Sequence, residues 1–351
     1  MPHVAVVIPC FRSARKIGDV VAAIPAFVQT IVCVDDASDD NMQEVLQSLA
    51  NSESRLQIVS HAKNKGVGGA TVSGYQRALD QGADILVKLD SDGQMNPSFI
   101  EALIAPIIDG EADYTKGNRF FDLEAVRAMP MLRLIGNAGL SLMTKLATGY
   151  WTLFDPTNGF TALHADVARI LPLNKLHSRY FFESDLLFRL ATVRANVVEL
   201  PMTAVYGDEK SNLSEVKVLF SFPLLHARNF FKRIVYSYFL RGFSAASLCL
   251  LTGLPMLIFG VTFGIDAWLE SARTNVPATA GTVMLSAMPM LMGFQLTLNF
   301  LQNDIAMVPK KAIHKRTALL SVLDEKARRL SHQREDAKKP SRRELKITSS
   351  D

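Results

Sequence analysis

Two long runs of uncharged residues limit what this chain can fold into. Residues 243–265 and 279–301 contain no Asp, Glu, Lys or Arg. A helix of about 20 apolar residues spans the hydrocarbon core of a bilayer, which is roughly 30 Å thick. We therefore predict two transmembrane helices at these positions. A buried helical hairpin in a water-soluble protein is the alternative.

Basic residues flank the pair of runs on one side of the predicted membrane. The loop between the runs offers Arg273 as its only cation, beside Asp266 and Glu270. By the positive-inside rule, we expect both termini and the head before residue 242 on the cytoplasmic side of the inner membrane. The flanking cations are Lys217, Arg228, Lys232, Arg233, Arg241, Lys310, Lys311, Lys315 and Arg316.

Strand-like and helix-like segments alternate through the head. The runs at 4–8, 30–36, 56–60 and 84–89 are rich in β-branched residues, and segments with helical spacing separate them. This alternation predicts the α/β class with a mostly parallel sheet.

The chain divides into four predicted parts. Residues 1–212 form the α/β domain, 213–241 form amphipathic helices on the membrane surface, 242–306 hold the two transmembrane helices, and 307–351 form a basic tail. We expect this tail to be loosely ordered after Pro309. Four apolar residues within it suit self-association into a homo-oligomer, namely Leu319, Leu320, Val322 and Leu323.

The charge balance argues against nucleic acid as a partner. The formal net charge is +4, and residues 309–351 hold 13 Lys and Arg against 6 Asp and Glu. The chain before this tail is therefore close to neutral, whereas a nucleic-acid-binding domain carries a basic patch or stripe.

Polar residues follow three of the predicted strands. They are the segment Pro9 to Ser13, the pair Asp35 and Asp36, and the segment Asp90 to Gln94. Ligands of parallel sheets bind beyond the carboxyl ends of the strands, so these clusters should converge on one crevice. The oxygens of Asp90, Asp92 and Gln94 suit Mg²⁺ or Mn²⁺, and such an ion would relieve the repulsion between the two carboxylates. An ordinary strand-end turn is the alternative.

Seven segments together resemble the family 2 glycosyltransferases. With two C-terminal spans, the chain is similar to the polyprenyl-phosphate glycosyltransferases of that family. The resemblance implies a GT-A fold and the inverting transfer of one sugar from a UDP- or GDP-linked donor to undecaprenyl, dolichyl or another polyprenyl phosphate. The segments are VVIPCF, VCVDDAS, NKGVGGA, KLDSDGQMNP, KGNRF, FDPTNGFTAL and ELPMTAVYGDEKSNL.

The resemblance also implies roles for single residues. The aspartate Asp155 is implied as a base or as a group that orients the acceptor. For the donor nucleotide it implies Pro9, Phe11, Asp35, Asp36 and Asp90, for the Mg²⁺ or Mn²⁺ ion Asp90, Asp92 and Gln94, and for the acceptor phosphate Arg119, Arg133 and Asn137.

Two positions depart from the family pattern. Ser13 stands where a glutamate is usual, and Val205 stands where relatives often carry an arginine. Lys210 is the candidate to replace that missing cation over the pyrophosphate, and a solvated loop charge is the alternative reading of the same residue.

Several assignments have structural alternatives. Asp155 precedes Pro156 and suits a turn, and the turn NKGVGGA suits either close packing on the sheet or phosphate contact. Arg119 and Arg133 suit phosphate, but Asp122 or Glu124 could pair with them instead. Glu183 and Asp185 either face the acceptor or favour a helix N-terminus by charge alone. At the level of function, the alternatives are a polysaccharide-extending glycosyltransferase and a non-catalytic membrane scaffold.

Overall fold

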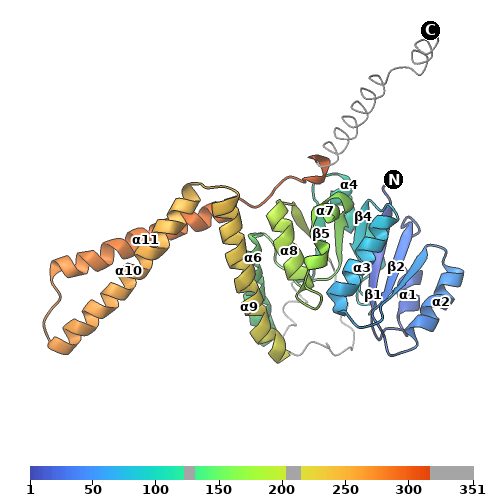
Figure 1. Cartoon of the computed structure of the whole chain (residues 1–351), viewed down its shortest axis with the longest axis horizontal. Helices are drawn as coiled ribbons and strands as arrows, with labels where there is room; N and C mark the ends of the chain where they lie inside the picture. Colours follow the sequence, from blue (N-terminus) through green and yellow to red (C-terminus); the bar gives the residue numbers. More distant parts are fainter. Residues whose placement is uncertain (122–130, 203–214, 317–351) are drawn as a thin grey trace, which may run out of the picture.

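The computed structural model describes residues 1–121, 131–202 and 215–316. It consists of an α/β head, a layer of helices beside it, and two long helices that extend away from the head (Figure 1). An α/β head followed by helices, with two long ones last, agrees with the predicted fold class, whereas the bounds of the four predicted parts stay a prediction.

A seven-stranded sheet forms the centre of the head. Its strand order is β3-β2-β1-β4-β6-β5-β7, and all neighbouring pairs are parallel except those that β6 makes with β4 and β5. The prediction of a mostly parallel sheet is confirmed, with one antiparallel strand inserted. The strands are β1 Val4–Cys10, β2 Thr30–Asp35, β3 Leu56–Ser60, β4 Ile85–Lys88, β5 Tyr114–Asn118, β6 Thr161–His164 and β7 Val197–Pro201.

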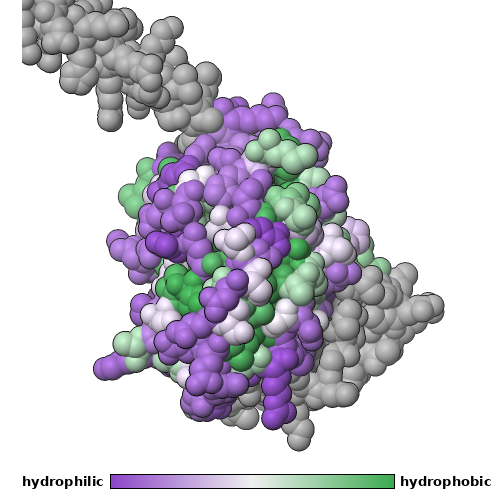
Figure 2. Space-filling view, turned by 90° about the vertical axis from the view of Figure 1, so that its right-hand side faces the viewer, coloured by the Kyte–Doolittle hydropathy of each residue, from purple (hydrophilic) through white to green (hydrophobic). Residues whose placement is uncertain are grey.

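Helices cover both faces of the sheet because both faces of its strands are apolar. In β1, Val6 and Ile8 pack under one layer of helices, whereas Ala5 and Val7 pack under the other. The first layer is α1 Ile17–Ala22, α2 Met42–Ser52 and α4 Ile100–Ile108, and the second is α3 Gly66–Asp80, α7 Ala165–Ile170 and α8 Phe182–Val193. The surface of the head that faces away from the long helices is mostly hydrophilic (Figure 2).

Helices α6 Met131–Thr148 and α9 Glu215–Ile234 stand between the sheet and the long helices (Figure 1). A π-helical turn, Val235–Leu240, follows α9 and leads into the first long helix. The segment 213–241, predicted as juxtamembrane helices, contains one α-helix and this turn. Helix α6, which comes from the first 212 residues, packs beside α9.

The two long helices are α10 Ala245–Thr274 and α11 Ala280–Ala306. Their most apolar windows have mean hydropathies of 2.1 and 1.3, and only 11% of each window is buried. A core hairpin of a soluble protein would be mostly buried, so the exposed apolar surface argues against that alternative. Gly253, Gly260 and Gly293 lie against the backbone of the opposite helix, where an added Cβ would collide, and such small residues typify contacts between membrane helices.

The chain returns to the head after α11. The backbone N–H groups of Ile313 and His314 donate to the buried carboxylate of Asp113, and the His314 ring nitrogen Nδ1 lies 2.8 Å from the same carboxylate. The His314 ring also stacks on that of His164. The expectation of a loose chain after Pro309 is therefore wrong as far as residue 316. The apolar residues expected to support self-association lie outside the described residues.

Gly74 tests the contact between α3 and the sheet. A Cβ at this position would overlap Val7 Cγ1 and lie 3.1 Å from Val34 Cγ2. We expect Gly74→Ala to destabilise the head by about 1–3 kcal/mol, because overpacking shifts the helix from the sheet. Gly18→Ala in α1 is the control: nothing lies within 4 Å of its Cβ, so the helix should gain up to about 1 kcal/mol. Thermal unfolding in detergent measures both, and equal melting temperatures would contradict the packing argument.

His226 tests the burial of α9 against the head. Its ring packs on those of Phe181 and Phe222, and neither ring nitrogen has a hydrogen-bond partner among the described residues. Burial lowers the pKa of His226 to about 4. The unfolded chain therefore binds a proton before the folded chain does, so stability falls as the pH drops from about 6.5 to 4, by on the order of 3 kcal/mol.

We expect His226→Phe to flatten this acid dependence, measured as melting temperature against pH. His177→Phe is the matched control, because this partly exposed histidine packs against the same Phe181 ring. An unchanged acid slope in His226→Phe would contradict the assignment.

Candidate active site

A buried lysine lies at the end of β4, directly before the predicted metal-binding turn. The Lys88 side chain is 1% exposed, and its Nζ lies 2.7 Å from Asp90 Oδ1 and 3.4 Å from Glu183 Oε1. It also donates to the Gly159 carbonyl. Burial alone would lower the pKa of Lys88, but the charges of Asp90 and Glu183 outweigh it and raise that pKa above its usual value. Lys88 therefore stays charged and fixes one oxygen of Asp90.

The turn after β4 has the donor set expected of a divalent-cation site. Gly93 adopts a φ of 72°, and Asp92 Oδ1 accepts the backbone N–H of Gln94 at 2.9 Å. Asp90, Asp92 and Gln94 are all partly exposed. Among the described residues, no three His, Cys, Asp or Glu side chains cluster as a complete metal site. Two carboxylates and one amide fit an ion that takes its remaining ligands from water and substrate oxygens.

Asp155 and Arg119 form a second charge pair, in which only the carboxylate is fully buried. Asp155 is fully buried, and its two carboxylate oxygens accept Arg119 Nε at 2.8 Å and Nη2 at 3.0 Å. Burial would raise the pKa of Asp155, but the hydrogen bonds and charge of Arg119 lower it below its usual value. A carboxylate held in this way is a poor base, so the geometry favours a role in orienting Arg119. The alternative partners of Arg119, Asp122 and Glu124, lie outside the described residues.

Glu199 on β7 holds the segment that carries Asp155. Its carboxylate accepts the backbone N–H groups of Phe154 and Asp155, each at 2.8 Å, and Asn118 Nδ2 at 2.7 Å. Two of these donors are backbone groups of the segment that carries Asp155, so Glu199 sets the position of the Asp155 backbone. Sequence reasoning missed Glu199, because it reads as an ordinary polar residue of an edge strand.

The register of the sheet places a second buried lysine beside this network. Lys88 pairs with Thr161, Thr161 with Lys116, and Lys116 with Glu199, so these side chains form one row across four strands. Lys116 is fully buried, and its Nζ has no hydrogen-bond partner among the described residues. Burial lowers the pKa of Lys116, while the carboxylates of Asp155 and Glu199 oppose that change. The available signal in the sequence was a lysine within each of two strand segments, at the end of ILVK and in the middle of YTKGN.

The residues implied in nucleotide binding lie at the ends of β1 and β2. Phe11 is 41% exposed just beyond β1, and Pro9 is buried within that strand. Asp35 accepts the Ser38 N–H, and the two oxygens of Asp36 accept the N–H groups of Lys65 and Gly66. Asp36 thus holds the glycine-rich turn in place, and its contact with a nucleotide stays a prediction.

The glycines of the turn NKGVGGA are required by close packing. An added Cβ would meet the Ser178 carbonyl oxygen at 2.6 Å from Gly66, and it would overlap the His177 carbonyl oxygen from Gly68. The partner of these two glycines is the segment before α8, so the predicted packing on the sheet is wrong for them, and phosphate contact stays a prediction. Ser13, which departs from the family pattern, bonds to Ser91 with its hydroxyl at 2.8 Å.

The remaining predicted site residues are only partly placed. Arg133 and Asn137 occupy adjacent turns of α6, so they lie on one face of that helix. Lys210 and Val205 lie outside the described residues. Glu183 pairs with Lys88, and Asp185 pairs with Arg189, so neither acid serves only the N-terminus of α8.

Comparison with known proteins assigns the family. Residues 5–171 match the model of glycosyl transferase family 2. A UDP-N-acetylglucosamine–dolichyl-phosphate N-acetylglucosaminyltransferase of Methanococcus voltae is 30% identical over 233 residues, which are 63% of this chain and 92% of that protein. The chain belongs to the family 2 glycosyltransferases.

Other family 2 relatives act, by name, on lipid phosphates. An undecaprenyl-phosphate mannosyltransferase of Micrococcus luteus is 28% identical, with 58% of this chain and 84% of that protein covered. Among solved structures, glucosyl-3-phosphoglycerate synthase from Mycobacterium tuberculosis with phosphoglyceric acid superposes with a TM-score of 0.50 and 18% identity. That match covers 66% of this chain and 80% of the other, and it supports the GT-A fold of this glycosyltransferase.

Asp155→Asn tests whether the buried pair orients Arg119. We expect the turnover of sugar transfer to fall by about tenfold or more, because Arg119 loses its charged partner and about 1.5–3 kcal/mol of hydrogen bonding. Asp166→Asn is the matched control, since Asp166 pairs with Arg169 at 2.7 Å on the exposed surface and should change the rate by less than about twofold. Steady-state kinetics measure both variants. Equal rates for Asp155→Asn and wild type would contradict the role.

Proposed function

We propose that this glycosyltransferase moves one sugar from a UDP- or GDP-linked donor to a polyprenyl phosphate at the cytoplasmic face of the inner membrane. The helix α6 carries the proposal. Its exposed apolar residues Met131, Ile135 and Leu142 form one stripe, 63% exposed at Ile135. At 100° per residue, Arg133 and Asn137 fall on the opposite face of the same helix. One helix thus joins an apolar surface suited to lipid with polar residues suited to a phosphate.

The donor would bind beyond the carboxyl ends of β1, β2 and β4. We assign its pyrophosphate to the turn of Asp90, Asp92 and Gln94, with a Mg²⁺ or Mn²⁺ ion held by those side chains. Such an ion supplies positive charge that neutralises the leaving nucleotide diphosphate. Solved complexes of the mycobacterial synthase contain Mn²⁺ and UDP, and the oxygen donors of this turn suit either ion. The nucleotide would lie near Pro9, Phe11 and Asp35.

The acceptor needs orientation more than it needs a base. A phosphate monoester has a second pKa near 6, so its oxygen is already anionic at neutral pH. That oxygen would attack the anomeric carbon of the donor sugar from the side opposite to the nucleotide diphosphate. The bond between this carbon and the diphosphate oxygen would break as the new bond forms, and the configuration would invert. Arg119, fixed by Asp155, would hold the phosphate together with Arg133 and Asn137, because a guanidinium binds phosphate through two hydrogen bonds.

The test of this function is a transfer assay on the full chain in detergent micelles. UDP- and GDP-sugars would be offered with polyprenyl phosphate and Mg²⁺ or Mn²⁺, and mass spectrometry would identify the lipid. We expect a polyprenyl phosphate that carries one added sugar, and a chelator should abolish its formation. Failure of every sugar donor to yield this lipid would overturn the proposal.

Asp92→Asn tests the metal-binding turn. We expect transfer to fall by about 100-fold or more, because one carboxylate ligand is lost from a site with only two. Asp80→Asn, an exposed carboxylate at the C-terminal end of α3, is the control for loss of one negative charge. Calorimetric titration of Mn²⁺ in the presence of nucleotide diphosphate gives a second readout. Unchanged Mn²⁺ affinity in Asp92→Asn would contradict the ligand assignment.

A further inference from the structure

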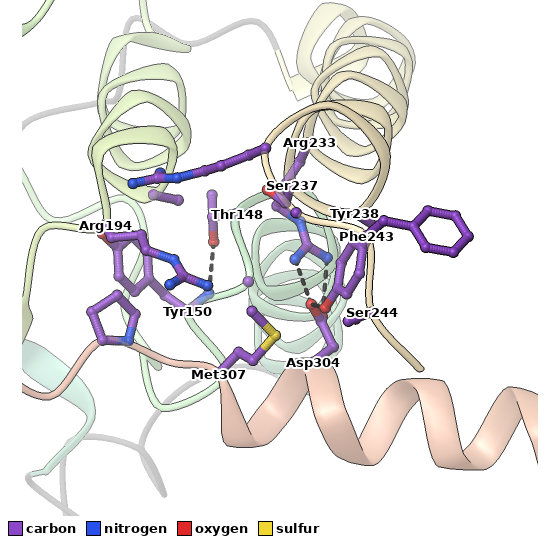
Figure 3. A pocket seen from close by; sticks show the side chains of 15 residues that line it. Thr148, Tyr150, Arg194, Arg233, Ser237, Tyr238, Phe243, Ser244, Asp304 and Met307 are labelled. Atoms are coloured by element: carbon purple, nitrogen blue, oxygen red, sulfur yellow. Dashed lines mark hydrogen bonds and ion pairs between the residues drawn. The ribbon is translucent and has the colours of Figure 1, made fainter. Parts of the chain in front are cut away.

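A cavity of about 280 Å³ lies where the head meets both long helices. Its walls come from the ends of α6 and α8, the π-helical turn after α9, the start of α10 and the end of α11 (Figure 3). Since one water occupies about 30 Å³, this volume would hold about nine waters or one small polar group. The family's sugar-transfer chemistry, which lies at the other end of the head, makes no use of this cavity.

Asp304 on α11 is the only carboxylate among the described residues that line this cavity, and it is already neutralised. It is 4% exposed, and it accepts Arg233 Nη1 at 2.6 Å and Nη2 at 3.0 Å. The Trp151 indole N–H and the Tyr238 hydroxyl donate to the same carboxylate. With four donors around it, Asp304 does not compete for further cations. Arg233 also lines the cavity, and its Nε is buried without a hydrogen-bond partner among the described residues.

Two further arginines give the cavity its net positive charge. Arg194 ends α8 in a left-handed conformation with φ 61°. Arg194 is exposed, and no hydrogen bond or ion pair of its guanidinium is found among the described residues. Arg241 donates from Nη1 to the Thr192 carbonyl, and no ion pair of its guanidinium is found in the part of the chain that the structure describes. Guanidinium groups that line one cavity are suited to bind phosphate oxygens.

The position of the cavity indicates where such a phosphate would come from. α10 begins at Ala245 and α11 ends at Ala306, so the cavity lies at the level where both helices would leave the hydrocarbon. Phe243, 61% exposed, and Leu240, 74% exposed, flank it with apolar surface. We propose that this cavity binds the phosphate of an anionic membrane phospholipid and so fixes the head against the bilayer. The inference rests on insertion of α10 and α11, as in the proposed function, but not on sugar transfer.

The proposed lipid site is separate from the acceptor site. Arg133 and Asn137 lie in the first turns of α6, whereas Thr148 and Gly149 at its other end line the cavity. At 1.5 Å per residue, the two ends are about 20 Å apart along the helix. A lipid bound in the cavity would therefore act as a structural partner and would not compete with the acceptor.

Native mass spectrometry of the delipidated full chain tests this proposal, with phosphatidylglycerol and phosphatidylcholine of the same chain length as probes. We expect preferential retention of phosphatidylglycerol and a rise in melting temperature that phosphatidylcholine does not give. Arg194→Gln with Arg241→Gln should weaken this retention by about tenfold or more, because each charged hydrogen bond to phosphate is lost.

The matched control removes two cations from the exposed side of α9. Arg228→Gln with Lys232→Gln makes the same change in charge and should alter retention by less than about twofold, since surface attraction to anionic lipid is diffuse. Equal losses in both double variants would overturn the proposal. So would equal retention of the two lipids by the wild type.

Two further arms keep the test decisive. Arg194→Gln alone leaves the Arg241 bond to Thr192 intact, so it should fold and still lose part of the preference. Inorganic phosphate in detergent separates a free anion from a lipid: a full rise in melting temperature with phosphate alone would contradict a lipid site. Since the readout is lipid binding, an inactive transfer assay would leave this result unaffected.

Discussion

The structure of the catalytic head depends on charges that are buried together at one end of its sheet. Lys88 on β4 and Lys116 on β5 are both buried, one on either side of Thr161 on β6. Burial of an isolated ammonium group costs several kcal/mol. For Lys88, the carboxylates of Asp90 on the turn after β4 and Glu183 on α8 offset that cost. For Lys116, the carboxylates of Asp155 and Glu199 oppose the effect of burial, but burial still lowers its pKa. A slip of β4 in register would move Lys88 away from Glu183 and from the Gly159 carbonyl. Lys88 also fixes the turn that would receive the donor, through Asp90.

Much of this arrangement follows from sequence, and the parts that do not are long-range pairings. The strand ends and the turn Asp90 to Gln94 are local, since an apolar run followed by Asp and Gly ends a strand in any context. The pairing of Arg119 with Asp155 depends on the insertion of antiparallel β6 between β4 and β5, which no local pattern reveals. The same insertion brings Lys88 and Lys116 to either side of Thr161. The lysines within the two strand segments could be seen in the sequence, but their partners could be identified only from the fold.

The attachment of the head to the membrane helices shows a similar limit. Arg233 reads in the sequence as one of several cations that mark the cytoplasmic flank, yet it is buried and paired with Asp304 at the end of α11. Arg233, which we used to predict the orientation in the membrane, thus links two helices through residues about 70 positions apart in sequence. The docking of His314 on Asp113 was equally invisible, because it depends on where α11 returns the chain.

These two attachments constrain how the site can work. The chain enters the membrane hairpin from α9, which packs beside α6 and α8. After the hairpin, Ile313 and His314 bind Asp113, the residue before β5. A hairpin tied to the head at both ends leaves little freedom for the head to tilt away from the bilayer. In the proposed function, an acceptor held by its lipid tail would approach along the apolar stripe of α6, and its phosphate would meet Arg119. Asp155 holds that guanidinium through Nε and Nη2. The orientation that we propose for the acceptor phosphate would therefore be set by the fold before either substrate binds.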